Sequence, residues 1–222
     1  RRYTKRLVTR SAQLRGAIFD GKNWQTNVDA GAPVLLLDLP RRPSKDLGPA
    51  ARRYIQSGEK QGFHKGYKCS IRDPWHSLPS VWSPDAFLLR QIHGYPKLVL
   101  NTAGASCTDT IHRVRFKERR EGRRIVTAFL NSLTFAFAEI TGRSYGGGVL
   151  ELEPNEADGL PVPLAGAETL ELRQADQCLR RGDGLHALLD RHDAILLVEG
   201  LGMTASDARA LRRIWTKLRD RR

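Results

Sequence analysis

The sequence predicts an α+β fold, in which a mixed sheet of short strands packs against a long helix and a C-terminal helical subdomain follows. Two observations carry this prediction. Between residues 63 and 116, short apolar runs are separated by Gly, Pro, Asn and Asp, which is typical of strands joined by turns. From residue 124 to the end, apolar residues recur at helical spacing. The chain has 222 residues, 40% of them hydrophobic, enough for one large domain or for a domain with a helical appendage.

The first 62 residues are the least regular part of the sequence. Residues 1–32 are rich in Arg, Gly and Asn, and we expect them to be irregular. Val34–Leu39 is an apolar run closed by Pro40, which favours a buried strand. Asp46–Ser57 carries its apolar residues on one stripe and therefore predicts a short helix, which Gly58–Gly62 would end.

The middle of the chain predicts the sheet and its packed helix. The expected strands are Tyr67–Arg72, Phe87–Gln91, Leu98–Asn101, Ile111–Phe116 and Val149–Leu152. Before the last of these strands, Arg124–Thr141 repeats apolar residues at helical spacing. This segment predicts a long helix, with Gly142 as its C-terminal stop.

After an extended Pro161–Pro163 connector, the pattern is helical to the end. Glu168–Arg181 and Leu185–Val198 predict two helices, and Thr204 or Ser206 caps a last one. We therefore divide the chain into three parts. They are a basic N-terminal segment with a strand and a helix (1–62), a central domain (63–164) and a C-terminal helical subdomain (165–222).

Positive charge is concentrated in the first part of the chain. Residues 1–130 contain 25 basic and 10 acidic side chains, whereas residues 131–222 contain 12 and 14. Solubility does not require such a one-sided distribution, so it indicates a polyanionic partner. Nucleic acid is favoured over a membrane, because the basic part has no amphipathic helix with a wide apolar face and no run of 18 apolar residues occurs.

Catalytic signatures are missing from the sequence. It has no Gly-x-Gly-x-x-Gly after a strand, no phosphate loop and no Gly-x-Ser-x-Gly. Gly200-Leu201-Gly202 follows a helical pattern and is interpreted as a helix-to-helix turn. Cys69, Cys107 and Cys178 lie far apart, which excludes a Cys-x-x-Cys metal knuckle and fits a reducing cytoplasm. Cys107 and His112 lack an orienting third residue and are interpreted as spectators. We expect no catalysis, cofactor or metal in this chain.

Several basic and polar side chains have the chemistry to contact DNA. Lys and Arg neutralise phosphates, Arg, Asn and Gln read base edges, and small polar loops offer backbone amides. A structural or solvated role is the alternative for each, and an ordinary tight turn is the alternative for the glycines. The candidates are Lys65, Lys68, Arg72, Trp75, Arg90, Asn101, Ser106, Thr108, Thr110, His112, Arg113, Arg115, Arg143, Ser144, Tyr145, Gly146 and Gly147.

Six segments of the central part form an ordered set of motifs. They are Tyr67–Trp75, Pro96–Asn101, Thr108–Val114, Phe129–Ser132, Ser144–Gly148 and Leu160–Pro163. Their order resembles the C-terminal target-recognition domains of adenine-N6 DNA methyltransferases in Type II and Type IIG restriction-modification systems. The resemblance covers roughly Phe63 to Leu164, and the terminal helices look like the usual tail of such domains. Residues 1–60 match nothing in that pattern.

The resemblance implies a function in recognition. It makes the central part a target-recognition domain for duplex DNA. Base flipping and methyl transfer from S-adenosylmethionine would then reside in an N-terminal domain, because the Asn/Asp-Pro-Pro-Tyr/Phe motif is not found here. The first residue, Arg1, fits a piece of a longer cytoplasmic protein. The implied partners are duplex DNA and that N-terminal domain, and no membrane. Two alternatives remain open, namely a nuclease with an unrecognised metal site and a non-catalytic specificity subunit acting in trans.

Overall fold

The computed structural model describes residues 2–222 and has the α+β architecture that the sequence predicts. Its central sheet has four strands in the order β2-β6-β4-β8. They are β2 (Ile18–Phe19), β4 (Ala86–Leu89), β6 (Leu98–Asn101) and β8 (Ile111–Val114). β4 is antiparallel to both neighbours and buried along its whole length. β8 lies at the edge of this sheet, so its outer side is open to other contacts.

Two smaller sheets flank the central one. The first has the order β3-β1-β7, in which β1 (Thr4–Val8) pairs antiparallel with β3 (Leu35–Leu37) and parallel with β7 (Ser106–Cys107). The second is antiparallel and has the order β5-β10-β9, formed by β5 (Gln91–Ile92), β10 (Val149–Glu151) and β9 (Arg143–Tyr145). Strands from residues 1–62 therefore share sheets with strands from the centre of the chain.

The expectation that residues 1–32 are irregular is wrong. Besides β1 and β2, this segment forms α1 (Gly21–Asp29). Asp20 caps this helix, accepting from the backbone nitrogen of Asn23 at 2.9 Å, while the Asn23 side chain accepts from the backbone nitrogen of Asp20. The short strands carry little signal of their own because β1 pairs with β7, about 100 residues away along the chain, and β2 with β6, about 80 residues away.

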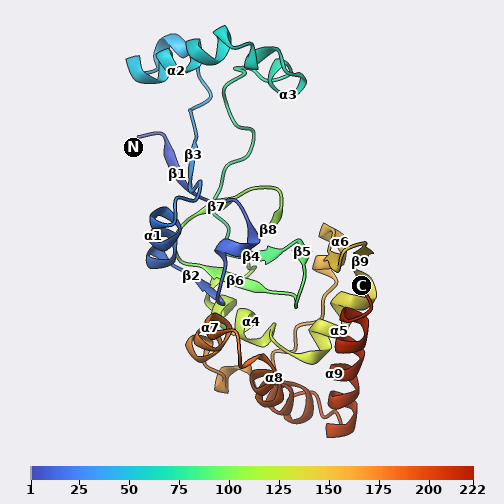
Figure 1. The fold of residues 1–222 in the computed structure, drawn as a ribbon. Coiled ribbons are helices and arrows are strands. Elements are labelled where there is room, and N and C mark those ends of the chain that lie inside the picture. The colour runs from blue at the N-terminus through green and yellow to red at the C-terminus, as the bar shows by residue number, and fades with distance from the viewer. Residues whose placement is uncertain (1) are drawn as a thin grey trace.

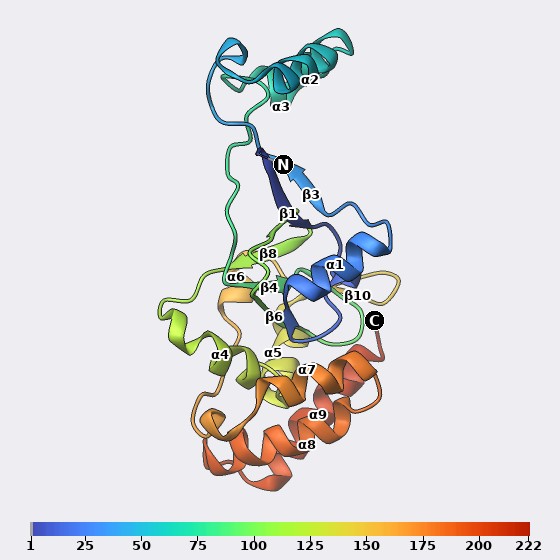
Figure 2. The same ribbon diagram turned by 90° about the vertical axis from the view of Figure 1, so that its left-hand side faces the viewer.

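Residues 40–80 form an arm that stands away from the body (Figure 1). The arm holds α2 (Pro49–Lys60) and α3 (Tyr67–Ser70), and two extended segments connect it to the body, as Figure 2 also shows. A small hydrophobic cluster at its base includes Leu47, Ala51 and Ile55, with Trp75 packed against it. This cluster is separate from the main core, and Leu37 of β3 also packs against it, so it joins the arm to the first small sheet.

Two predictions for the arm need correction. The expected strand Tyr67–Arg72 is wrong, because its first four residues form the short helix α3 and no strand lies beside them to pair with. Helix α2 starts at Pro49, a favoured first position, and continues past Gly58. Gly58 does not end the helix. A β-carbon there would lie 2.9 Å from the Trp75 ring, so this glycine lets the indole pack on the helix.

The long helix expected over Arg124–Thr141 is in fact two helices, α4 (Gly122–Ala128) and α5 (Ser132–Thr141). Asn131 separates them. Its side chain accepts from the backbone nitrogen of Thr134 at 2.9 Å and donates to the carbonyl of Ala128 at 2.6 Å. Asparagine competes in this way with the helical hydrogen bonds, whereas apolar periodicity continues across the break.

The first of the remaining helices lies beside β9, and the others cover the end of the body opposite the arm (Figure 1). They are α6 (Pro154–Asp158), α7 (Leu172–Arg181), α8 (Leu185–Asp193), which continues as a π-helical turn over Ala194–Glu199, and α9 (Ala205–Arg219). Thr204 caps α9, as predicted, while the helix expected from Glu168 starts only at Leu172. Trp215 of α9 is fully buried and stacks edge-on against Phe135 of α5. Both belong to the main core, which also contains Phe87 of the central sheet.

Candidate nucleic-acid interface

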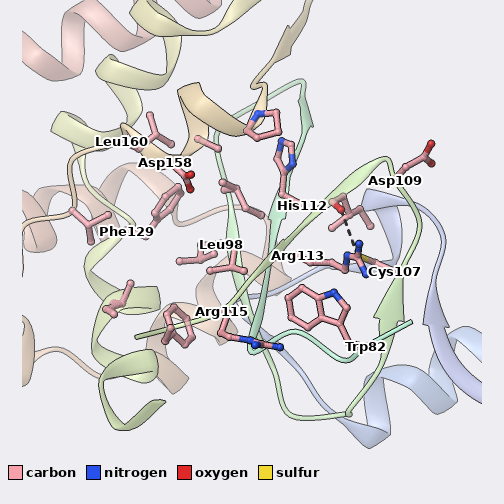
Figure 3. A pocket seen from close by; sticks show the side chains of 18 of the residues that line it. Trp82, Leu98, Cys107, Asp109, His112, Arg113, Arg115, Phe129, Asp158 and Leu160 are labelled. Atoms are coloured by element: carbon pink, nitrogen blue, oxygen red, sulfur yellow. Dashed lines mark hydrogen bonds between the residues drawn. The ribbon is translucent and has the colours of Figure 1, made fainter. Parts of the chain in front are cut away.

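Two arginines share one tryptophan at the open edge of the central sheet. The guanidinium carbon of Arg113 lies 5.0 Å from the ring centroid of Trp82, and that of Arg115 lies 4.7 Å from it. Figure 3 shows both guanidinium groups next to the indole ring. Arg113 lies on β8 and Arg115 follows directly after the end of this strand. We call these three residues the arginine–tryptophan stack.

The stack leaves the arginines accessible for hydrogen bonding. Both arginine residues are exposed, and neither forms an ion pair with a carboxylate within residues 2–222. Arg113 donates from Nη1 to the carbonyl of Ser80 at 3.2 Å and to the Ser80 hydroxyl at 3.5 Å. A guanidinium carries five N–H donors around its edge, and stacking on a ring uses its flat face. Most of these donors therefore remain free for a ligand.

The stack borders an open hollow with a volume of about 820 Å³. One side is formed by the end of β7, the loop that follows it and β8, including Cys107, Asp109 and His112 (Figure 3). The other side comes from α4, α6 and the segment after α6, including Phe129 and Asp158. His112 contacts the carbonyl of Leu152 at 2.7 Å, which links β8 to the segment after β10. The hollow therefore combines an apolar floor with charged groups at its rim.

Other candidates near β8 hold the structure together. The amide nitrogen of Asn101 donates to the carbonyls of Pro84 and Ala105, and its oxygen accepts from the backbone nitrogen of Ala105. Its hydrogen-bonding groups are therefore used within the chain. Ser106 is buried in β7. The hydroxyl groups of Thr108 and Thr110 contact each other and the carbonyl of Thr9.

Two candidate arginines are neutralised by glutamates. Arg90 lies 2.7 Å from both Glu151 and Glu153, and these carboxylates raise its pKa. Arg143 pairs with Glu156 at 2.9 Å, and this partner likewise raises the pKa of the arginine. Half-exposed Arg143 thereby ties β9 to α6. A paired arginine is a weaker phosphate ligand, because it must give up its existing partner.

The remaining hairpin candidates lie at the turn between β9 and β10. Ser144 and Tyr145 are exposed on β9, and the three glycines form the turn. Gly147 and Gly148 have positive φ values of 86° and 79°. Such values favour glycine, so a tight turn accounts for these residues. Figure 1 places this hairpin beside α6, far from the arm. The candidates are thus distributed over three regions, namely the arm, the edge of β8 and this hairpin.

The four arm candidates differ in their surroundings. Lys65 and Lys68 are exposed and Arg72 is half-buried. Trp75 packs against α2 and donates its indole N–H to Glu59 at 3.1 Å, which gives it a role inside the arm. The candidate set did not include the exposed arginines of α2 or the ring of Trp82. The sequence feature that could have identified both is the density of basic and aromatic residues between residues 41 and 82.

Catalytic and cofactor chemistry finds little support in these residues. Burial raises the pKa of the Cys107 thiol to about 12, so it stays protonated at neutral pH and is not a nucleophile there. Within residues 2–222 no three His, Cys, Asp or Glu side chains are placed to hold a metal ion. Gly200 packs on the carbonyl of Ala165, where a β-carbon would lie at 2.5 Å. The turn that contains Gly200 follows a helix, as predicted, and not a strand.

A basic α+β domain with exposed, unpaired arginines is the kind of protein that binds a polyanion. Comparison with family models identifies the family. The chain belongs to the family described as Type II methyltransferase M.Eco57I, C-terminal domain, whose model matches residues 1–197. Comparison with curated proteins and with solved structures gives no match.

The family match confirms the resemblance to the C-terminal domain of a restriction-modification methyltransferase. It also extends the resemblance, because it includes residues 1–62, which the sequence motifs did not assign. Enzymes of this type methylate DNA, so the family supports DNA as the substrate of the parent protein. In the described part of the chain, no helix is both long and apolar enough to cross a membrane.

Proposed function

We propose that this chain is the target-recognition part of a site-specific adenine-N6 DNA methyltransferase, and that it binds duplex DNA sequence-specifically. The observation that carries the proposal is the arginine–tryptophan stack. Two exposed guanidinium groups without carboxylate partners lie on one ring at the border of a large open hollow. Restraining a flexible arginine before binding reduces the entropy that is lost when DNA binds.

The chemistry of the hollow suits base recognition. An arginine can donate two parallel hydrogen bonds to O6 and N7 of guanine in the major groove. Carboxylates can accept from N4 of cytosine, and Asp109 and Asp158 both line the hollow. The exposed cations near β8, including Lys117 and Arg123, would then contact phosphates and set the register of the protein on the duplex.

The proposed division of labour assigns only recognition to this chain. Methyl transfer from S-adenosylmethionine and flipping of the adenine would take place in an N-terminal domain of the parent, in the cytoplasm. The chain's own side chains would clamp the duplex and position the target base. The family membership supports this division, because the family describes a C-terminal domain of a methyltransferase.

Fluorescence anisotropy with a labelled duplex tests DNA binding. The variant Arg113→Ala/Arg115→Ala should weaken binding about 30-fold or more, since each good base contact contributes about 1–3 kcal/mol and the variant removes two of them. The matched control Arg209→Ala/Arg213→Ala removes the same charge from the exposed side of α9 and should change affinity little. Equal losses of affinity in both variants, or a wild-type affinity that does not change with salt concentration, would contradict the proposal.

Two further measurements test specificity. Selection from a random duplex library should enrich one sequence with the wild-type chain and should lose that enrichment with Arg113→Ala/Arg115→Ala. Genomic DNA from cells that express the parent protein should contain N6-methyladenine at that sequence. Methylation found only on cytosine would refute the adenine assignment while leaving DNA recognition intact.

A further inference from the structure

The cations of the arm have no carboxylate partners. Residues 40–80 contain nine Lys and Arg side chains and three acidic ones. The nine are Arg41, Arg42, Lys45, Arg52, Arg53, Lys60, Lys65, Lys68 and Arg72. None of them forms an ion pair within the described residues 2–222. Concentrated unpaired charge of one sign repels itself, which makes an anionic partner favourable.

Helix α2 presents part of this charge on one face. Its buried residues Ala51, Ile55 and Gly58 follow helical spacing and pack toward the base of the arm. Arg53 and Lys60 project from the opposite face, since residues seven apart lie on nearly the same side of a helix. Arg52 flanks them and is also exposed. The outward face of α2 is therefore a row of cations.

Exposed aromatic residues accompany the cations. Tyr54 is 65% exposed on α2 and Tyr67 is 79% exposed on α3. A tyrosine hydroxyl can donate to a phosphate oxygen, and its ring can pack on a sugar. Aromatic residues interleaved with cations are more typical of a nucleic-acid surface than of a solubilising one.

We propose that the arm is a second DNA-contacting element, which holds phosphates of the duplex beside the sequence that the hollow recognises. This inference rests on the proposed function, because the hollow must first place the duplex. The segment from Trp75 to Ser80 connects the two regions, and the carbonyl of Ser80 contacts Arg113.

Arm neutralisation tests the inference in the full chain. The variant Arg52→Gln/Arg53→Gln/Lys60→Gln removes three exposed cations, and the control Arg209→Gln/Arg213→Gln/Lys217→Gln removes three from the exposed face of α9. On a duplex of about 24 base pairs, the arm variant should bind about tenfold more weakly than wild type. The slope of log affinity against log salt should fall by about 2 to 3. The control should keep the wild-type slope.

Hydroxyl-radical footprinting locates the contact. The arm variant should lose protection on one flank only and keep the central footprint. An arm variant that matches the control in affinity, slope and footprint overturns the inference. If the arm variant matches the control but Arg113→Ala/Arg115→Ala still weakens binding, the proposed function stands and only the role of the arm is refuted. A wild-type chain that fails to bind DNA overturns both.

Discussion

The carboxylate of Asp193 accepts two hydrogen bonds from Ser132, one from its backbone nitrogen at 2.8 Å and one from its hydroxyl at 2.6 Å. Arg212 completes this buried network. Its guanidinium donates to the Ser132 hydroxyl at 2.6 Å and pairs with Asp193 at 2.6 Å. The network therefore joins the start of α5 to α8 and α9. The network gives the Asn131-Ser132 segment a structural role, which accounts for the residue types found there.

Asp193→Ala should strongly destabilise the chain. It leaves the Ser132 amide and the Arg212 guanidinium without their buried partner, which costs about 3 kcal/mol or more. Urea unfolding measures the change. Asp190→Ala is the matched control, because Asp190 pairs with the same arginine at 3.3 Å but is 78% exposed. An exposed pair contributes about 0–1 kcal/mol, so equal losses in both variants would contradict the argument.

His192 should make the free energy of unfolding fall as the pH is lowered. Burial lowers the pKa of His192 to about 4, against the opposing effects of the hydrogen bond with the Leu130 backbone and of the Asp193 charge. The unfolded chain therefore binds a proton below about pH 6.5, while the folded chain does not. The stability contribution is complete above that pH and is lost as the pH falls toward 4.

Between about pH 7.5 and 5 this effect should cost about 2 kcal/mol of unfolding free energy. Other groups also titrate in this range, so the difference between wild type and His192→Gln isolates it. His93→Gln, at an exposed histidine, is the control and should keep the wild-type pH dependence. A His192→Gln variant with an unchanged pH profile would show that the ring is not held neutral.

The sequence predicted those parts of the fold whose signal is local. Leu98–Asn101 is a strand with the predicted bounds, because apolar residues run between turn residues on both sides. Thr204 caps α9 as expected. The break at Asn131 was missed, since apolar spacing continues through it while one side chain interrupts the helix. The strands of residues 2–32 were missed because their stability comes from distant partners.

In the candidate site, too, the sequence indicated some residues correctly, while the role of others depends on contacts made by the fold. Charge and strand alternation pointed to Arg113 and Arg115, which the structure brings together on Trp82. The pattern could not show that Arg90 is paired with glutamates or that Asn101 has internal partners, because those contacts come from the fold. Residue type identifies which side chains can bind DNA. Only packing determines which of them are free to do so.

Trp75→Ala should open the arm without unfolding the body. The indole packs on α2 and contacts a cluster separate from the main core, so its loss removes much of the arm's packing. Hydrogen exchange should accelerate in residues 49–60 and stay slow in residues 86–101. Tyr54→Ala is the control, because that ring on the same helix is 65% exposed. Uniformly faster exchange would indicate that arm and body unfold together.

Cys107 should react slowly with alkylating reagents. Burial raises the pKa of its thiol to about 12, so the thiolate fraction at pH 8 is about a thousandfold below that of a free cysteine. The double variant Cys69→Ser/Cys178→Ser leaves Cys107 as the one cysteine, and iodoacetamide labelling followed by mass spectrometry measures its rate. Labelling in urea provides the rate for the unfolded chain. A folded rate within about tenfold of that value would contradict the buried, protonated thiol.

Trp82 should contribute to DNA affinity without touching a base. The ring restrains two guanidinium groups at 5.0 and 4.7 Å, and each such contact contributes about 0.5–1 kcal/mol at an exposed site. Trp82→Ala should therefore weaken binding about tenfold, while Trp82→Phe, which keeps an aromatic face, should recover part of the loss. In the background of Arg113→Ala/Arg115→Ala, Trp82→Ala should have no further effect, because there is nothing left to restrain. Fluorescence anisotropy on all four variants completes this cycle. Additive losses would show that Trp82 acts on the duplex independently of the two arginines.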